Sequence, residues 1–422
     1  MVTTRRTRGR FEAFWAIALL ALMAATFRLW LPAGWTGAGD YPAVPMFDLA
    51  NVGLAQQATG LISTVITGVI VIACWVIVGL GRARWAWPII AASLAISVVL
   101  DQHRLQPWVY QSFLYAVLFT LAPRNESGQA SEPAFRLIRL LTISVYVFSA
   151  VGKFDFQFLH TVGQDFLRAP LQWVGVDVST WPVRTRLFAA ASFPAFELCV
   201  AFALCWSRTR MLGVWMATAM HLGLLTVLSP LGLGHSPGVM VWNVVMAIQA
   251  WWLFAGPALE PDRDAESGPR PVGWLASWLA WATVAVALLM PVFERSGYWD
   301  HWLAWALYSP HSSRVSLQVH ESALERLPAA WQVAVGADED ADRWHDLRLG
   351  SLSLAIRGVP AVPQARYQWA LANQLIQQSG IENQVRGKVQ SASDRWTGER
   401  DEQWWTRPDE FQAAGEAYWF VP

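Results

Sequence analysis

The run TGLISTVITGVIVIACWVIVGL, residues 59–80, contains no charged side chain. A transmembrane α-helix needs ~20 consecutive, mostly apolar residues, so this run predicts a helix that crosses a bilayer. Eight further apolar segments are predicted to span in the same way, at residues 14–31, 85–100, 107–122, 137–156, 187–206, 211–229, 239–256 and 272–293. We therefore expect about nine transmembrane helices within residues 1–293.

Composition agrees with a membrane protein. Hydrophobic residues make up 54% of the chain and charged residues 15%, whereas soluble proteins are typically about 25% charged. The 27 tryptophans fit a protein whose partner is the lipid bilayer, since these rings gather at membrane interfaces. The net charge is zero, which argues against nucleic-acid binding. The three cysteines form no CxxC motif, and no Cys/His spacing indicates a metal site.

Arginine and lysine predict the orientation, because cytoplasmic loops are enriched in them. With the N-terminus inside, the inner segments hold thirteen such residues and the outer segments six. Residues 294–422 then lie on the periplasmic face of a bacterial inner membrane. We expect the first segment to be a retained anchor; the alternative is a cleaved signal peptide.

The tail after residue 293 is mixed in character and predicts a small α+β extramembrane domain. Arg314–His320 alternates like a strand, and Glu321–Trp331 is predicted as a helix. A longer helix is predicted over Tyr367–Gln378, ended by Gly380. The expected fold is thus an all-α polytopic membrane bundle with this domain at its C-terminus.

Lys153 is the first candidate catalytic residue. It is one of only two lysines among 31 basic residues, and it lies near the end of the apolar segment 137–156. Burial can deprotonate a lysine but not an arginine, so Lys153 is a candidate general base. The structural alternatives are snorkelling to the interface or a salt bridge to Asp155.

Glu197 and His221 each lie about ten residues into neighbouring antiparallel segments, so both are expected near mid-depth. They are candidates for a proton relay or a charged pair, against an interhelical hydrogen bond of structural value only. Asn243 is a further candidate for the lining of a cofactor site.

Two loop residues are weaker candidates for cofactor binding. Arg104 follows His103 in a tight turn, where the sequence favours the structural alternative, an interfacial cap. His160 lies with Asp165 in the loop after segment 137–156, at the expected mouth of a site.

The middle of the chain resembles two groups of membrane proteins. The residues that carry the resemblance are Tyr146-x2-Ser149-Ala150-x-Gly152-Lys153, then Pro194-x2-Glu197, Arg208-Thr209-Arg210 and a mid-helix His221, all within residues 137–256. One group is the DoxX/MauE-like membrane modules, and the other is the vitamin K-dependent gamma-carboxylase-like (HTTM) domain. Phe154 departs from the carboxylase-like pattern, which often has a second basic residue after the lysine.

The resemblances imply different functions. The DoxX/MauE-like group implies a redox- or quinone-associated protein of the bacterial envelope, with a quinone as candidate cofactor and envelope redox proteins as partners. The carboxylase-like group implies a membrane enzyme in which Lys153 is the base. A third hypothesis is a non-catalytic scaffold that presents the C-terminal domain. The residues by themselves decide neither whether the protein is an enzyme nor which cofactor it binds.

Reporter fusions test the predicted topology at segment 137–156, whose Lys153 and Asp155 weaken its hydropathy. Green fluorescent protein fused after residue 126 should fluoresce and fused after residue 176 should not, because it folds only in the cytoplasm. Alkaline phosphatase fusions should give the reverse. Equal signals on both sides would show that this segment does not cross.

Overall fold

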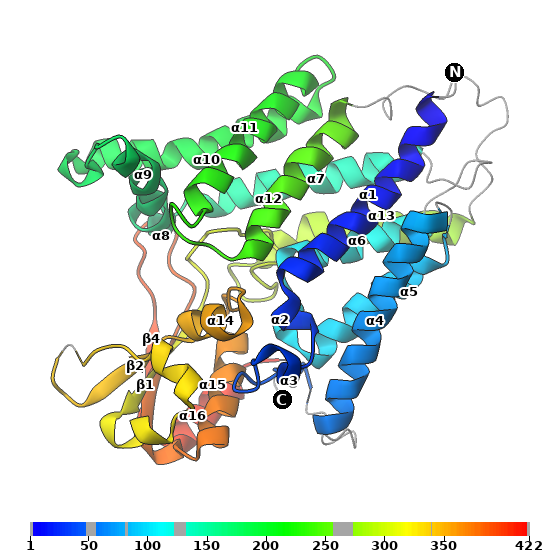
Figure 1. Ribbon diagram of the computed structural model, residues 1–422. Helices are drawn as coiled ribbons and strands as arrows, with labels where there is room; N and C mark the ends of the chain where they lie inside the picture. Colours follow the sequence, from blue (N-terminus) through cyan, green and yellow to red (C-terminus); the bar gives the residue numbers. More distant parts are fainter. Residues whose placement is uncertain are drawn as a thin grey trace. The chain divides into compact units, whose positions relative to one another are not determined.

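The computed structural model describes residues 3–47, 56–80, 83–121, 132–255, 273–338 and 340–419 (Figure 1). The chain divides into two compact units, which are described separately. The helical unit comprises residues 1–25, 69–94 and 107–310, and the sheet unit comprises residues 26–68, 95–106 and 311–422. Arg82, Arg124, Arg263 and Arg270, which contribute to the predicted orientation, lie outside the described residues.

Within the described residues, six helices are long and apolar enough to cross a membrane. They fall on predicted segments, and by length and composition they make this a multi-pass helical membrane protein. These helices are α4 (Gln56–Leu80), α7 (Glu132–Lys153), α10 (Val183–Cys205), α11 (Arg210–Leu228), α12 (Pro237–Ala250) with a π-helical turn at Trp251–Ala255, and α13 (Trp274–Leu289) with a 3-10 turn at Met290–Phe293.

The other three predicted segments also carry helices, but their apolar parts are shorter. The apolar part of α1 (Thr3–Ala25) is Phe11–Ala25, and α5 (Ala86–Leu100) and α6 (Pro107–Leu121) have 15 residues each. A 15-residue helix is about 22 Å long, less than the ~30 Å hydrocarbon core. The count of nine spans therefore stays a prediction.

Four helices of the helical unit pack in succession. α10 contacts both α7 and α11, and α11 contacts α12 (Figure 1). α10 and α11 approach closely at Gly213, where a Cβ would lie 2.9 Å from the backbone nitrogen of Leu204. α9 (Val162–Trp173) packs against α10 and α11, and α8 (Phe156–His160) precedes it.

The sheet unit contains a four-stranded antiparallel sheet in the order β2-β1-β3-β4. Its strands are β1 (Arg314–His320), β2 (Trp344–Leu347), β3 (Val385–Gln390) and β4 (Glu402–Trp405). Its helices are α2 (Phe27–Trp30), α3 (Ala33–Thr36), α14 (Leu349–Arg357), α15 (Ala365–Ser379) and α16 (Pro408–Gly415), with 3-10 turns at Gln102–Arg104 and Glu382–Gln384. Alternate residues of β1 are buried, as a sheet with one covered face requires.

Segments far apart in the sequence meet inside the sheet unit. The hydroxyl groups of Tyr41 and Tyr367 lie 3.0 Å apart, and the Trp331 indole donates to the Asp40 carbonyl at 2.7 Å. The compact unit thus includes residues that precede the C-terminal tail by hundreds of positions.

Two of the predicted elements of the tail are confirmed and one is wrong. β1 has the predicted bounds, and α15 ends at Gly380, whose φ of 60° is the left-handed conformation that favours glycine. The helix predicted over Glu321–Trp331 is instead two 3-10 turns, Glu321–Arg326 and Ala329–Ala334. Pro328 separates them, because proline disfavours helical geometry in the residue before it.

Candidate functional site

α7 presents three polar side chains on one face. Tyr146, Ser149 and Lys153 are spaced by three and four residues, the spacing at which helical side chains lie above one another. All three are buried, although the rest of this segment is largely apolar. The helix ends at Lys153, so its ammonium group lies at the end of α7 and Tyr146 lies two turns earlier.

Lys153 forms a buried ion pair with Glu197 of α10. Its Nζ donates to Glu197 Oε2 at 2.6 Å and to the Ser149 hydroxyl at 2.6 Å. The side chains of Lys153 and Glu197 are only 7% and 10% exposed. The two charges compensate each other, which a buried charge in an apolar bundle requires.

His221 of α11 is held between a tyrosine and an asparagine. Its Nδ1 lies 2.9 Å from Asn243 Oδ1, and its Nε2 lies 3.0 Å from the Tyr146 hydroxyl. The Asn243 NH2 group donates to the Val239 carbonyl at 2.9 Å, which leaves the amide oxygen to accept from the ring. A neutral His221 then carries its proton on Nδ1 and accepts the Tyr146 hydroxyl proton at Nε2.

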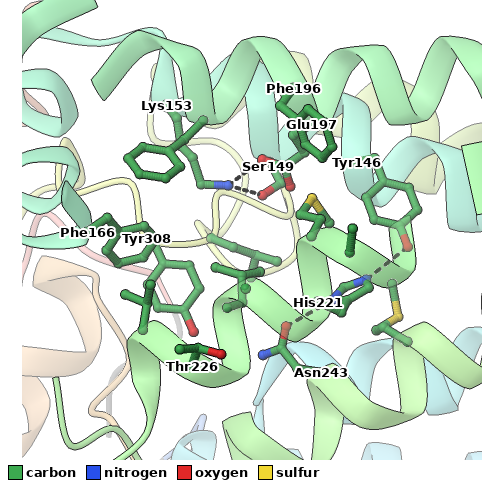
Figure 2. Close-up of a pocket in the computed structure, with 18 of the residues that line it drawn as sticks. Tyr146, Ser149, Lys153, Phe166, Phe196, Glu197, His221, Thr226, Asn243 and Tyr308 are labelled. Atoms are coloured by element: carbon green, nitrogen blue, oxygen red, sulfur yellow. Dashed lines mark hydrogen bonds and ion pairs between the residues drawn. The ribbon is translucent and has the colours of Figure 1, made fainter. Parts of the chain in front are cut away.

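The Lys153–Glu197 ion pair and the Tyr146–His221–Asn243 chain line one cavity of about 570 Å³, which lies entirely within the helical unit. Figure 2 shows Lys153, Ser149 and Glu197 together at one place and the chain from Tyr146 through His221 to Asn243 at another. Most of the remaining wall is apolar, with the side chains of Val145, Phe166, Phe193, Phe196, Leu224 and Met246 among it. The volume is in the range typical of sites for small organic ligands.

The sequence-predicted site residues divide into those the cavity brings together and those it does not. Lys153, Glu197, His221 and Asn243 all line it. Arg104 is a buried residue of the sheet unit, where its Nε donates to the Leu29 carbonyl at 3.1 Å.

The loop residue His160, predicted at the mouth of a site, lies away from the cavity. His160 is exposed, stacks on Phe156 with ring centroids 3.9 Å apart, and is not a cavity residue. Asp165 pairs with Arg168 at the surface. Cys199 and Cys205 are free, exposed thiols.

Two pairing hypotheses from the sequence are wrong. Lys153 does not pair with Asp155, which instead accepts from Arg295 at 2.6 Å. Glu197 and His221 do not contact each other, because each is bonded to another partner on α7. The positions of these two residues along their helices predict a similar depth, but the rotation of each helix about its axis decides which side chains they contact.

Tyr146, Ser149 and Tyr308 line the cavity but were not among the site residues predicted from the sequence. Tyr146 and Ser149 share the helical face of Lys153, so the spacing of polar residues along α7 was a usable signal. Tyr308 also lines the cavity, and it comes from the segment after the last apolar helix, where no sequence pattern connects it with α7.

Comparison of the chain with family models, with curated proteins and with solved structures gives no match. The chemistry of the site is therefore inferred from its own geometry.

A double-mutant cycle tests the ion pair. Lys153→Met and Glu197→Gln should each lower the free energy of unfolding by roughly 3–5 kcal/mol, because each leaves the other charge buried without a partner. The double variant should lose less than the sum of the two, as measured by denaturant titration in detergent micelles.

Lys388 provides the matched control, because it pairs with Glu402 at 2.9 Å with side-chain exposures of 23% and 35%. Lys388→Met should cost much less than Lys153→Met, because solvent screens an exposed ion pair. Additive losses in the Lys153–Glu197 cycle would contradict a direct interaction.

Proposed function

We propose that the cavity binds a quinone-like molecule, and that the protein is an inner-membrane component of a redox process in the bacterial envelope. The observation that carries this proposal is one mostly apolar cavity with two polar positions on the same helix. Tyr146 and Lys153 are seven residues apart on α7, or about 10 Å along the helix axis. A flat apolar ring with oxygen atoms on opposite sides could pack against the apolar wall and place its oxygen atoms toward these two polar positions.

The two polar positions have complementary hydrogen-bonding capacity. The Lys153 ammonium has three N–H donors, of which two are used by Glu197 and Ser149, so one is available to a carbonyl oxygen of the ligand. The Tyr146 hydroxyl donates to His221 and keeps its oxygen as an acceptor. The cavity therefore suits both an oxidised ligand, which only accepts, and a reduced ligand, which also donates.

The resemblance of residues 137–256 to DoxX/MauE-like modules supports the same class of function. In this proposal the N-terminus is cytoplasmic and the C-terminal domain faces the periplasm, as the arginine distribution favours. Envelope redox proteins are the proposed partners of that domain.

A binding measurement tests the proposal. Organic extraction of the purified protein should release a quinone, and decylubiquinone should quench tryptophan fluorescence saturably, because Trp242 lines the cavity. Tyr146→Phe should weaken binding roughly three- to tenfold through the loss of one hydrogen-bonding group.

Thr218→Val is the matched control, since Thr218 accepts from the Trp251 indole at 2.9 Å on the same helix as His221 and does not line the cavity. It should leave the affinity unchanged. No quinone in the extract together with no saturable quenching would overturn the proposal.

A second candidate function is base catalysis of the carboxylase-like kind. It is favoured by the convergence of Lys153, Glu197 and His221 on one cavity. Lys153 acts as a base only after its ammonium gives up a proton, and Glu197 is the contacting group that can take it.

The Tyr146–His221 pair can accept a proton without such a step. The Tyr146 oxygen takes a proton from the ligand while the Tyr146 hydroxyl proton passes to His221 Nε2.

Lys153→Arg distinguishes this candidate from quinone binding alone, because arginine keeps the charge but cannot be deprotonated. If the lysine is the base, proteoliposomes supplied with reduced menadione should consume oxygen above the protein-free rate. In Lys153→Arg, the oxygen-consumption rate above the protein-free rate should be roughly 100-fold lower, while the protein still inserts into the membrane. Full activity in Lys153→Arg would remove the lysine from the mechanism.

A further inference from the structure

The segment 294–310, which follows the 3-10 turn Met290–Phe293, contributes Leu307 and Tyr308 to the cavity wall. It belongs to the helical unit, so its contacts with α6 and α7 lie inside one compact body. The segment is attached at several points, and each of them constrains where Tyr308 lies.

Two contacts hold the segment against the helices. Arg295 donates to Asp155, just beyond the end of α7, at 2.6 Å, and the Asp155 side chain is fully buried. Trp305 is also fully buried and packs on Tyr110 of α6, with ring centroids 5.0 Å apart.

Gly152 gives the segment room beside the ion pair. A Cβ at Gly152 would lie 3.0 Å from the Ser309 hydroxyl oxygen and 3.7 Å from the Ala306 Cα. The glycine next to Lys153 therefore allows the segment to lie directly against α7, with Tyr308 adjacent to the contact.

Tyr308 is held in a conformation that a bulky residue rarely adopts. Its φ is 58°, in the left-handed region, and such strain persists only where surrounding contacts enforce it. Its ring lies against Phe166 at the cavity wall, with 5.3 Å between ring centroids (Figure 2). The His235 ring lies 5.6 Å from it between centroids.

The Tyr308 hydroxyl has no hydrogen-bond partner among the described residues, although the residue lines the cavity. Burial raises the pKa of Tyr308, and the nearby charge of Glu197 raises it further, so the hydroxyl keeps its proton. A hydroxyl that faces a mostly apolar cavity without a protein partner can donate its proton in a hydrogen bond to an oxygen atom of the occupant.

We infer that Tyr308 is a specificity-determining residue whose hydroxyl donates a hydrogen bond to an oxygen atom of the bound ligand, and that Gly152 positions it there. The inference rests on the proposed function, because it takes the ligand to be an oxygen-bearing ring. The Tyr308 hydroxyl is then a second hydrogen-bond donor besides the Lys153 ammonium. Two donors favour a ring with carbonyl acceptors over a plain hydrocarbon.

The test compares two labelled probes, menadione and methylnaphthalene, which share a ring system and differ in the carbonyl oxygens. Binding is measured on protein in nanodiscs and corrected for empty nanodiscs. Tyr308→Phe should weaken menadione binding roughly three- to tenfold and leave methylnaphthalene binding unchanged. Gly152→Ala should weaken menadione binding in the same direction, because it displaces Ser309.

Tyr298→Phe is the matched control, since Tyr298 lies in the same segment, is 76% exposed and does not line the cavity. It should change neither affinity. Unchanged menadione binding in Tyr308→Phe, or an equal loss for both probes, would overturn the donor role while the proposed function stands. Wild-type protein that binds neither probe would overturn both.

Discussion

The ion pair between Lys153 and Glu197 is the contact on which the rest of the site depends. A charge buried among apolar helices is costly by several kcal/mol, so each of these side chains requires the other. The 2.6 Å contact joins α7 to α10, and α10 in turn contacts α11. Tyr146, on the same helix as Lys153, lies 3.0 Å from His221 of α11.

The same pair gives the cavity its chemical asymmetry. Lys153 at the end of α7 supplies hydrogen-bond donors, and the chain through Tyr146, His221 and Asn243 supplies an acceptor two turns away. Gly152 allows the segment 294–310 to close against α7 beside the lysine. Within the Ala150-x-Gly152-Lys153 motif, Gly152 thus has a steric role and Lys153 an electrostatic one.

The sequence was sufficient for what local pattern controls. Hydropathy located helices at the predicted apolar segments, and alternation located β1, because both depend on residues close together in the chain. Lys153 was identified because a chain that uses arginine almost throughout places a lysine within an apolar segment. The partner of Lys153 could not be predicted, since the rotation of α10 decides whether Glu197 faces α7 or α11. Tyr308 could not be predicted either, because its approach to the cavity depends on tertiary contacts at Gly152 and Tyr110.

Photoaffinity labelling tests the central claim, that one cavity between α7 and α11 holds the ligand. An azido-quinone is irradiated with the membrane-embedded protein, and the labelled residues are mapped by mass spectrometry. We expect label within Val145–Lys153, within Ala219–Val227 and at Leu307 or Tyr308, and excess unlabelled quinone should displace all of it. Label confined to exposed apolar residues such as Trp75 and Trp215, or label that excess quinone does not displace, would contradict it.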